Sequence, residues 1–155
     1  GHSMGGNITL RILTVSPDIK AAVIWGGVVG TYDDLMNNWQ RKVSYQPPPN
    51  ELANRNNNRA NLIAKYGTPK ENSEFWNSID PNFNLQYITA PIQLHAGLLD
   101  EEVPWQFSQG LEGRLKQAGK SVEFYSYEGA DHNISSPSFE IASQRSVDFF
   151  DRYLK

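Results

Sequence analysis

The stretch Gly1-His2-Ser3-Met4-Gly5-Gly6 decides the fold, because its first five residues fit the pattern G-x-S-x-G of a nucleophile elbow. In such an elbow a serine sits on a tight turn between a strand and a helix, with a strained backbone and small neighbours. Apolar residues at helical spacing predict a helix directly after it, namely Ile8, Ile12 and Val15, with Leu10 and Leu13 widening the stripe. Proline disfavours a helical conformation in the residue before it, so Ser16-Pro17 ends this helix.

Helices and strands alternate along the rest of the chain. Residues 21–25, Ala-Ala-Val-Ile-Trp, form a continuous apolar run that suits a strand covered on both faces of a parallel sheet. Two further strands are predicted at 91–96 and 121–127, and two helices at 105–118 and from Pro137 onward. This alternation predicts an α/β protein with parallel strands and flanking helices.

Residues from about 31 to 89 have a different character, and we interpret them as a cap-like insertion. Gln46-Pro-Pro-Pro-Asn50 is expected to be extended, because consecutive prolines restrict the backbone and remove hydrogen-bond donors. The polar segment 54–61 is either a solvated helix face or a loop. Aromatic residues scattered through the stretch argue against simple disorder, so we expect a small irregular unit with one or two short helices.

The composition limits the classes of protein and of site. The chain has 155 residues, enough for one domain with a core, and a net charge of −3. This balance argues against a nucleic-acid surface, and no apolar run reaches the roughly 20 residues that span a bilayer. The absence of cysteine excludes disulfides, thiolate catalysis and cysteine-bound zinc. A missing signal peptide favours the cytoplasm, but the first residues resemble the middle of a larger protein, so the compartment stays open.

A serine nucleophile needs a base, and the base needs a carboxylate to orient it. Of the three histidines, His2 lies inside the elbow, where its side chain cannot easily turn back on Ser3. His95 lies in the middle of a predicted strand and is interpreted as a packed residue. His132 lies in a loop after the last strand and is the predicted base. The N–H of Met4, at the start of the predicted helix, is the expected oxyanion donor.

Asp100 is the predicted acid because it follows a strand end, and parallel α/β sheets place their chemistry at the carboxyl ends of strands. Its competitors are Glu101, Glu102 and Asp131. Asp131 directly precedes the predicted base, and sequence neighbours rarely point at each other, so its carboxylate is interpreted as a loop cap. The resulting order along the chain is that of α/β-hydrolases, namely Ser3, Asp100, His132.

These motifs resemble the C-terminal half of the α/β-hydrolase catalytic domain of the prolyl oligopeptidase family, serine peptidase family S9. The hexapeptide at 1–6 is similar to the elbow of that family, and the similarity covers nearly the whole chain, most weakly from 31 to 59. Further segments similar to the family's landmarks are 66–69, 88–91, 97–104, 118–120 and 127–132. The chain departs from the family at Ala96, where glycine is usual, and near Asp131, where glycine is frequent; we expect both departures to be tolerated.

The resemblance implies that Ser3 is the nucleophile, Asp100 the acid and His132 the base of a serine hydrolase that needs no metal or organic cofactor. The leading interpretation is a serine-type peptidase acting on peptides. A carboxylesterase acting on small acyl esters is the alternative, and a binding module without activity is a third reading. Aromatic residues that are candidates for pocket walls or for core packing are Trp39, Tyr45, Trp76 and Trp105.

The resemblance also implies a neighbour for the strand at 21–25. In such folds the nucleophile strand and several others precede the elbow, and a second oxyanion donor comes from an early loop. An unpaired apolar edge favours aggregation or pairing with another chain. We therefore expect a fragment that is nearly inert alone, and whose partner at this edge is the N-terminal half of the domain or another chain.

Overall fold

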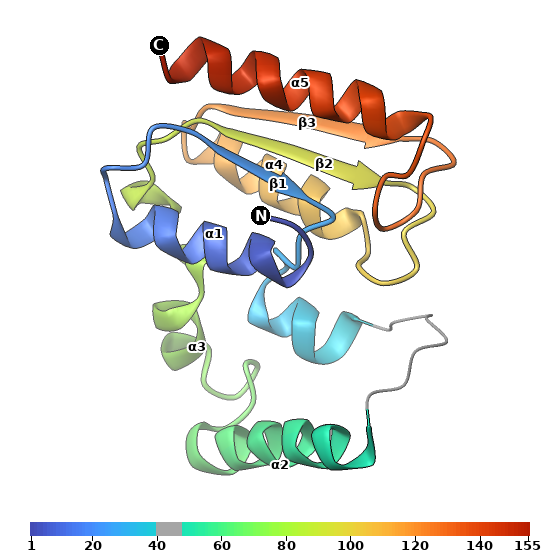
Figure 1. Ribbon diagram of the computed structural model, residues 1–155. Coiled ribbons are helices and arrows are strands. Elements are labelled where there is room, and N and C mark those ends of the chain that lie inside the picture. Colours follow the sequence, from blue (N-terminus) through green and yellow to red (C-terminus); the bar gives the residue numbers. More distant parts are fainter. Residues whose placement is uncertain (40–47) are drawn as a thin grey trace.

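Three short strands form one sheet in the computed structural model, which describes residues 1–39 and 48–155. In spatial order the strands are β1 (Ala22–Trp25), β2 (Ile92–Gly97) and β3 (Val122–Tyr127). Both pairs are parallel, and their register places Trp25 beside His95 and His95 beside Tyr125. The predicted α/β architecture with a parallel sheet is therefore confirmed (Figure 1).

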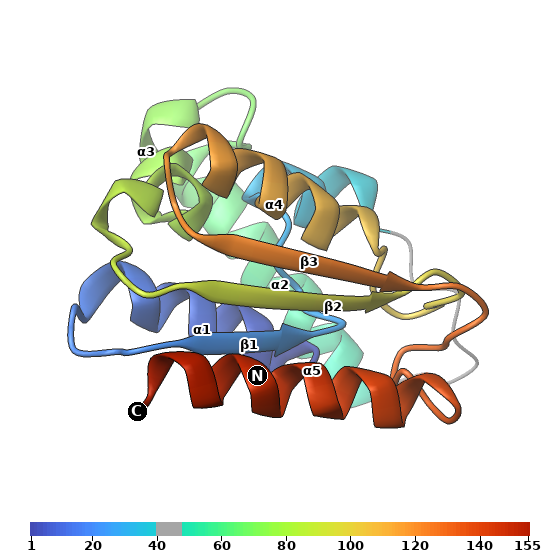
Figure 2. The ribbon, with the colours of Figure 1, turned by 90° about the horizontal axis from the view of Figure 1, so that it is seen from above.

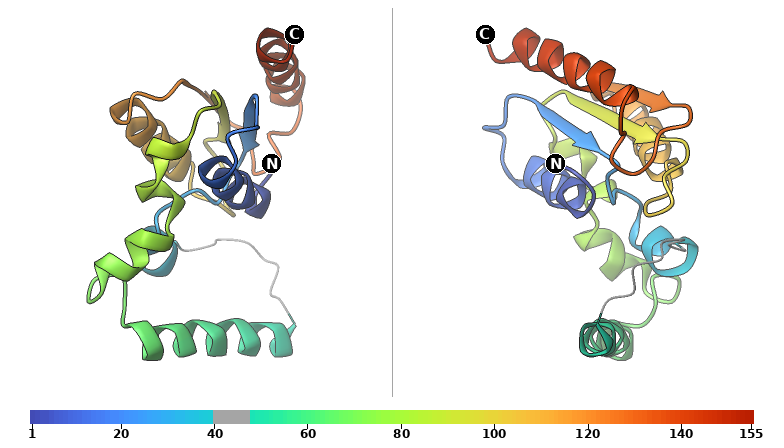
Figure 3. Two further views of the ribbon diagram at one scale, coloured as in Figure 1. Left: turned by 90° about the vertical axis from the view of Figure 1, so that its left-hand side faces the viewer. Right: turned by 45° about the vertical axis from the view of Figure 1, so that its right-hand side comes forward.

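Helices cover both faces of the sheet, so the body of the molecule has three layers (Figures 2 and 3). Two helices, α1 (Met4–Val15) and α4 (Gln106–Gln117), pack on one face, and α5 (Ser138–Tyr153) packs on the other. These three helices match the predicted ones to within a few residues. Among the helices of residues 1–39 and 48–155, none has the length and apolarity needed to cross a bilayer.

The two faces of the sheet differ because strand side chains alternate between them. On the α1 and α4 side, apolar strand residues join helix residues in the main core, which includes Ile24, Ile92, Leu94, Leu10, Leu13, Phe107, Leu111 and Leu115. On the α5 side the strands present aromatic and polar side chains, namely Trp25, Gln93, His95, Tyr125 and Tyr127. The central strand β2 is buried along its whole length, which gives the loop after it a rigid base.

The apolar residues of α1 divide between two sides of the helix. Leu10 and Leu13 are 0% and 2% exposed in the main core, whereas Ile8 is 55% and Val15 80% exposed. Residues two positions apart lie on opposite sides of a helix, so the predicted stripe could not serve one face. The expectation of a single widened stripe was wrong, and the exposed row of Ile8, Ile12 and Val15 leaves an apolar surface on the outside of the described chain.

The connection between β1 and β2 contains more helix than expected. Its elements are a π-helical turn η1 (Asp34–Asn38), α2 (Pro49–Tyr66), α3 (Ser73–Ile79), and two short 3₁₀ turns, η2 (Pro81–Phe83) and η3 (Leu85–Tyr87). The prediction of short helices was wrong for α2, which has 18 residues and includes the polar segment 54–61, exposed at 54 and 56–61. In Figure 1, α2 lies apart from the sheet and its flanking helices.

The proline segment before α2 is only partly extended. Pro48 is extended, with φ −49° and ψ 144°, but Pro49 and Asn50 already belong to the helix. A proline at the first helical position costs little, because the N–H that it lacks would have no partner there. Gln46, Pro47 and the aromatic candidate Tyr45 lie outside the described residues.

One edge of the sheet carries an apolar groove. Residues 1–3 run beside β1, where the Trp25 N–H donates to the Gly1 carbonyl and the Ser3 N–H donates to the Trp25 carbonyl, at 2.9 and 3.0 Å. The groove between this edge and α5 has a volume of about 740 Å³, and its walls include Val23, Phe139 and Phe150. This edge is the place where the sequence predicted a further neighbour.

Candidate active site

Ser3 occupies the turn between residues 1–2, which run beside the edge of β1, and α1. Its backbone is strained, with φ 53° and ψ −122°, and α1 begins at the next residue. The turn is closed by Gly5 N–H donating to the His2 carbonyl at 2.7 Å and Gly6 N–H donating to the Ser3 carbonyl at 2.9 Å. These are the features of the elbow that the sequence predicted.

Two of the three glycines around the serine are required by close approaches of the backbone. A β-carbon at Gly1 would lie 2.4 Å from the carbonyl oxygen of Gly5, and one at Gly6 would lie 2.7 Å from a methyl group of Ile24. A β-carbon at Gly5 would meet open space among the described residues. The last glycine of the G-x-S-x-G pattern is thus less constrained than the glycine after it.

Asp100 and His132 are joined by a hydrogen bond at the carboxyl ends of β2 and β3. His132 Nδ1 lies 2.8 Å from Asp100 Oδ2, and the Asp100 side chain is only 1% exposed. The other carboxylate oxygen, Oδ1, accepts the backbone N–H groups of Glu102 and Val103 at 2.8 and 2.9 Å. Because a carboxylate accepts, His132 Nδ1 carries the proton of this hydrogen bond.

The loop that carries His132 comes against the end of β1, next to the elbow. Gly26 follows the strand with φ +48°, and a β-carbon there would lie 3.0 Å from the His132 carbonyl oxygen and 3.2 Å from Nδ1. The residue before Gly26, Trp25, accepts the N–H of Ser3. The structure therefore brings the Ser3 turn, Asp100 and His132 to one rim of the sheet.

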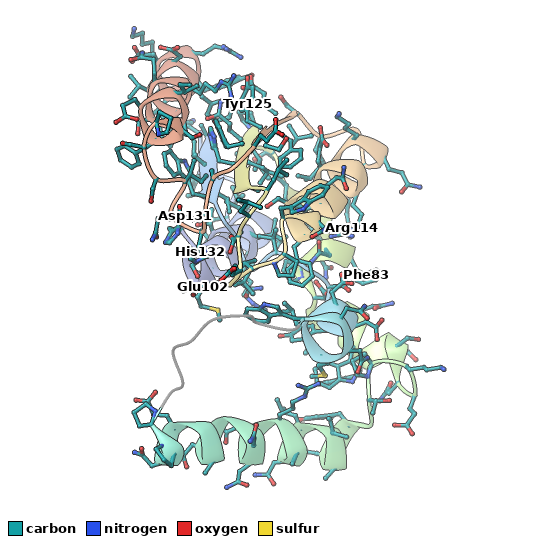
Figure 4. The ribbon with its side chains drawn as sticks, turned by 90° about the vertical axis from the view of Figure 1, so that its right-hand side faces the viewer. Phe83, Glu102, Arg114, Tyr125, Asp131 and His132 are labelled. Carbon is teal, nitrogen blue, oxygen red and sulfur yellow. The ribbon has the colours of Figure 1, made fainter. Side chains whose placement is uncertain are left out.

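The competing carboxylates have other surroundings. Asp131 accepts the N–H and the hydroxyl of Ser135, both at 2.9 Å, and these bonds hold the pKa of Asp131 below its ordinary value. Its interpretation as a loop cap is confirmed. Glu102 supplies its backbone N–H to Asp100 and its carbonyl to Trp39. Figure 4 shows Glu102 and His132 near each other, on the loops that follow β2 and β3.

His95 is fully buried and packed, as predicted. Its Nε2–H donates to Gln93 Oε1 at 2.7 Å, and Nδ1 accepts the Tyr127 hydroxyl at 2.8 Å. Burial, and then the nearby charge of Arg145, lower the pKa of His95 from 6.5 to about 3. His95 is thus neutral at pH 7 and lies on the α5 side of the sheet. The neighbouring Ala96 is 1% exposed within the same strand.

His2 has a neighbour that the sequence analysis did not find. Its Nε2 lies 3.2 Å from the His132 carbonyl oxygen, and the two imidazole rings have centroids 4.7 Å apart. The sequence argument set His2 aside because its side chain cannot reach Ser3. No local pattern indicates the contact, because the two histidines are 130 positions apart.

The remaining predicted site residues divide between surface and core. Met4 is 56% exposed at the start of α1, and its N–H makes no hydrogen bond to any residue within 1–39 and 48–155. Trp76 is 2% exposed and belongs to the core, while Trp39 Nε1–H donates to Glu102. Trp105 lines a cavity of about 490 Å³ beside Asp100.

In the part of the chain that the structure describes, no three His, Asp or Glu side chains are grouped to hold a metal ion.

Comparisons with known proteins agree with the geometry. The fold is that of an α/β-hydrolase. The model of the prolyl oligopeptidase family matches residues 1–155, so the chain belongs to this family. No curated protein matches the chain in sequence.

Solved structures with the same fold include peptidases and a putative dienelactone hydrolase. A puromycin-hydrolyzing peptidase of Mycobacterium tuberculosis superposes with TM-score 0.71 and 19% identity, over 99% of this chain and 21% of that one. An acylaminoacyl peptidase of Pyrococcus horikoshii gives 0.69 and 22%, over 99% and 23%. A putative dienelactone hydrolase of Klebsiella pneumoniae gives 0.60 and 20%, over 99% and 50%. The chain spans less than a quarter of the length of the two peptidases.

Burial of neutral His95 predicts that acid destabilises the protein. Its pKa is lower in the folded state, so the unfolded chain binds an extra proton between pH 6.5 and about 3. Stability from this group is therefore present above pH 6.5 and is lost as the pH falls, by up to about 1.4 kcal/mol per pH unit. Urea unfolding at pH 6.5 and 4.5 should show a smaller loss in His95→Asn than in wild type; an identical loss would contradict the prediction.

Proposed function

We propose that Ser3, His132 and Asp100 form the catalytic triad of a serine hydrolase, and that the whole protein is a serine-type peptidase. One observation carries the proposal: the 2.8 Å hydrogen bond between buried Asp100 and His132, on the rim where Ser3 sits in a strained elbow. Membership of the prolyl oligopeptidase family supports the same reading.

The reaction follows from the positions of the protons. With Nδ1–H facing Asp100, His132 Nε2 takes the proton of Ser3 as the serine hydroxyl oxygen attacks a carbonyl carbon. Asp100 holds the imidazole in this tautomer and stabilises the imidazolium that forms. His132 then gives the proton to the leaving amine or alcohol, and an acyl group remains on Ser3. Water attacks this acyl-enzyme by the same steps and restores the serine.

The oxyanion of each tetrahedral intermediate requires donors where the negative charge develops. The N–H of Met4 points from the first turn of α1, where the helix dipole also favours negative charge. We propose Met4 N–H as one donor. The cavity of about 490 Å³ beside Asp100, with walls from Leu98, Leu99 and Trp105, is a candidate for holding part of the substrate.

Peptides are the proposed substrates and small acyl esters the alternative. A puromycin-hydrolyzing peptidase and an acylaminoacyl peptidase share the fold, which favours peptides, whereas a putative dienelactone hydrolase with the same fold keeps the ester reading open. The Asp100–His132 hydrogen bond supports an active enzyme over a binding module without activity.

Residues 31–89 are proposed to act as a cap beside this site. The Trp39 side chain donates to the Glu102 carbonyl at 2.8 Å, so the insertion contacts the loop of Asp100. Further along, Leu85 and Ile88 are buried in the main core and hold the end of the insertion against the body. The groove at the β1 edge is proposed to receive the N-terminal half of the domain or another chain, because its walls are apolar.

Covalent labelling tests the nucleophile. A fluorophosphonate probe should label the full-length protein, and Ser3→Ala should abolish the labelling because the attacking oxygen is lost. The matched control is Ser78→Ala, which removes an exposed hydroxyl on α3 and should label like wild type. Labelling that persists in Ser3→Ala would place the nucleophile elsewhere.

Two neighbouring aspartates test the acid. Asp100→Asn should lower kcat/KM by about 10³- to 10⁴-fold, because the amide no longer holds the productive tautomer of His132. Asp131→Asn, which changes a loop cap adjacent in sequence to the same histidine, should retain activity within a few-fold. Steady-state kinetics on both variants decides the assignment; equal losses would remove the distinction on which it depends.

Substrate preference distinguishes a serine-type peptidase from a carboxylesterase. Purified full-length protein should cleave aminoacyl or dipeptidyl amides as well as short acyl esters, since a peptidase must protonate an amine leaving group. Initial rates with matched amide and ester substrates of the same acyl group provide the measurement. Turnover of esters alone would favour the carboxylesterase.

A further inference from the structure

We propose that His2 is a positioning residue that holds the backbone of His132, an inference that rests on the proposed triad. His2 Nε2 lies 3.2 Å from the His132 carbonyl oxygen, and its ring lies against the His132 ring with an interplanar angle of 46°. The turn that carries Ser3 therefore contacts the proposed base through the side chain of His2.

The acceptor determines the protonation of His2 in this contact. A carbonyl oxygen carries no hydrogen, so His2 Nε2 must be the donor. The same histidine is also held by Asp100, which binds His132 Nδ1. One bond thus fixes the imidazole of the base, and the other fixes the carbonyl of its backbone.

His2 links the position of the His132 backbone to the position of the elbow. The residues on either side of it, Gly1 and Ser3, are both hydrogen-bonded to Trp25 at the end of β1. Its α-carbon is therefore attached to the sheet and to the nucleophile at once. The His132 loop, by contrast, crosses from β3 to α5 outside the sheet, and it approaches the elbow closely because Gly26 has no side chain.

Through the bond from His2 to the His132 carbonyl, the distance between Ser3 and His132 depends little on movements of the rest of the His132 loop. During the reaction His132 gains and loses a proton, and its backbone must stay in place while its charge changes. Small displacements of catalytic groups are costly, since misplacement by 1 Å lowers rates by about 10²-fold. The role of His2 is to limit such displacement through the His132 carbonyl.

Substitutions at His2 that remove its N–H donor, its aromatic ring or both test the proposal. His2→Gln keeps an N–H donor on an unbranched side chain, whereas His2→Met has similar length and no donor, and His2→Phe keeps the ring alone. In the full-length protein we expect Met and Phe to lower kcat about tenfold with KM and melting temperature nearly unchanged, and Gln to restore most of kcat. His2 is exposed, so these variants should fold.

A second readout does not depend on hydrolysis. The Nδ1–H of His132, bonded to a carboxylate, should give a low-field proton resonance that His132→Gln removes. In His2→Met this resonance should broaden through faster exchange with water, and in His2→Gln it should stay sharp. If Ser3 fails to react with a fluorophosphonate, the triad proposal fails, while this resonance still decides whether His2 orders His132. Unchanged kcat and resonance in Met and Phe, or equal losses in Gln, would overturn the proposal.

Discussion

Parallel pairing of β1, β2 and β3 is the constraint on which the rest of the site depends. In a parallel sheet all carboxyl ends lie along one edge, and each strand is followed there by one component of the site. Gly26 follows β1 beside the elbow, the Asp100 loop follows β2, and the loop to His132 follows β3. The bond between Asp100 and His132 joins two of these loops. Strand register thus brings together residues that are widely separated along the chain, and contacts between the loops then hold them in place.

The parts of the structure that the sequence predicted are those whose local pattern coincides with their tertiary role. The elbow is defined by steric demands within six residues, and Ser3 has the strained backbone that the pattern requires. β2 was recognisable because a buried parallel strand needs a short apolar run, and β3 because it is rich in Val, Phe and Tyr. Asp131 was recognisable as a cap because it directly precedes His132, and the structure gives it a partner four positions away, Ser135.

The parts that could not be predicted depend on contacts that no local pattern contains. Periodicity tells which residues share a side of α1, but the sheet decides that Leu10 faces inward and Ile8 outward. The long helix α2 has a composition typical of loops, and its extent could not be read from polar residues alone. The partner of His2 is 130 residues away along the chain, so no local pattern of charge or spacing could indicate the contact.

The way Asp100 is stabilised has a consequence for how this active site can evolve. Its oxygen Oδ1 is bound by main-chain N–H groups of residues 102 and 103, which every amino acid except proline provides. Substitutions at position 101, and substitutions other than proline at position 102, therefore leave the bonds that solvate the anion in place. A loop built in this way can vary the side chains that it presents to incoming molecules, while the main-chain bonds to the proposed acid are kept.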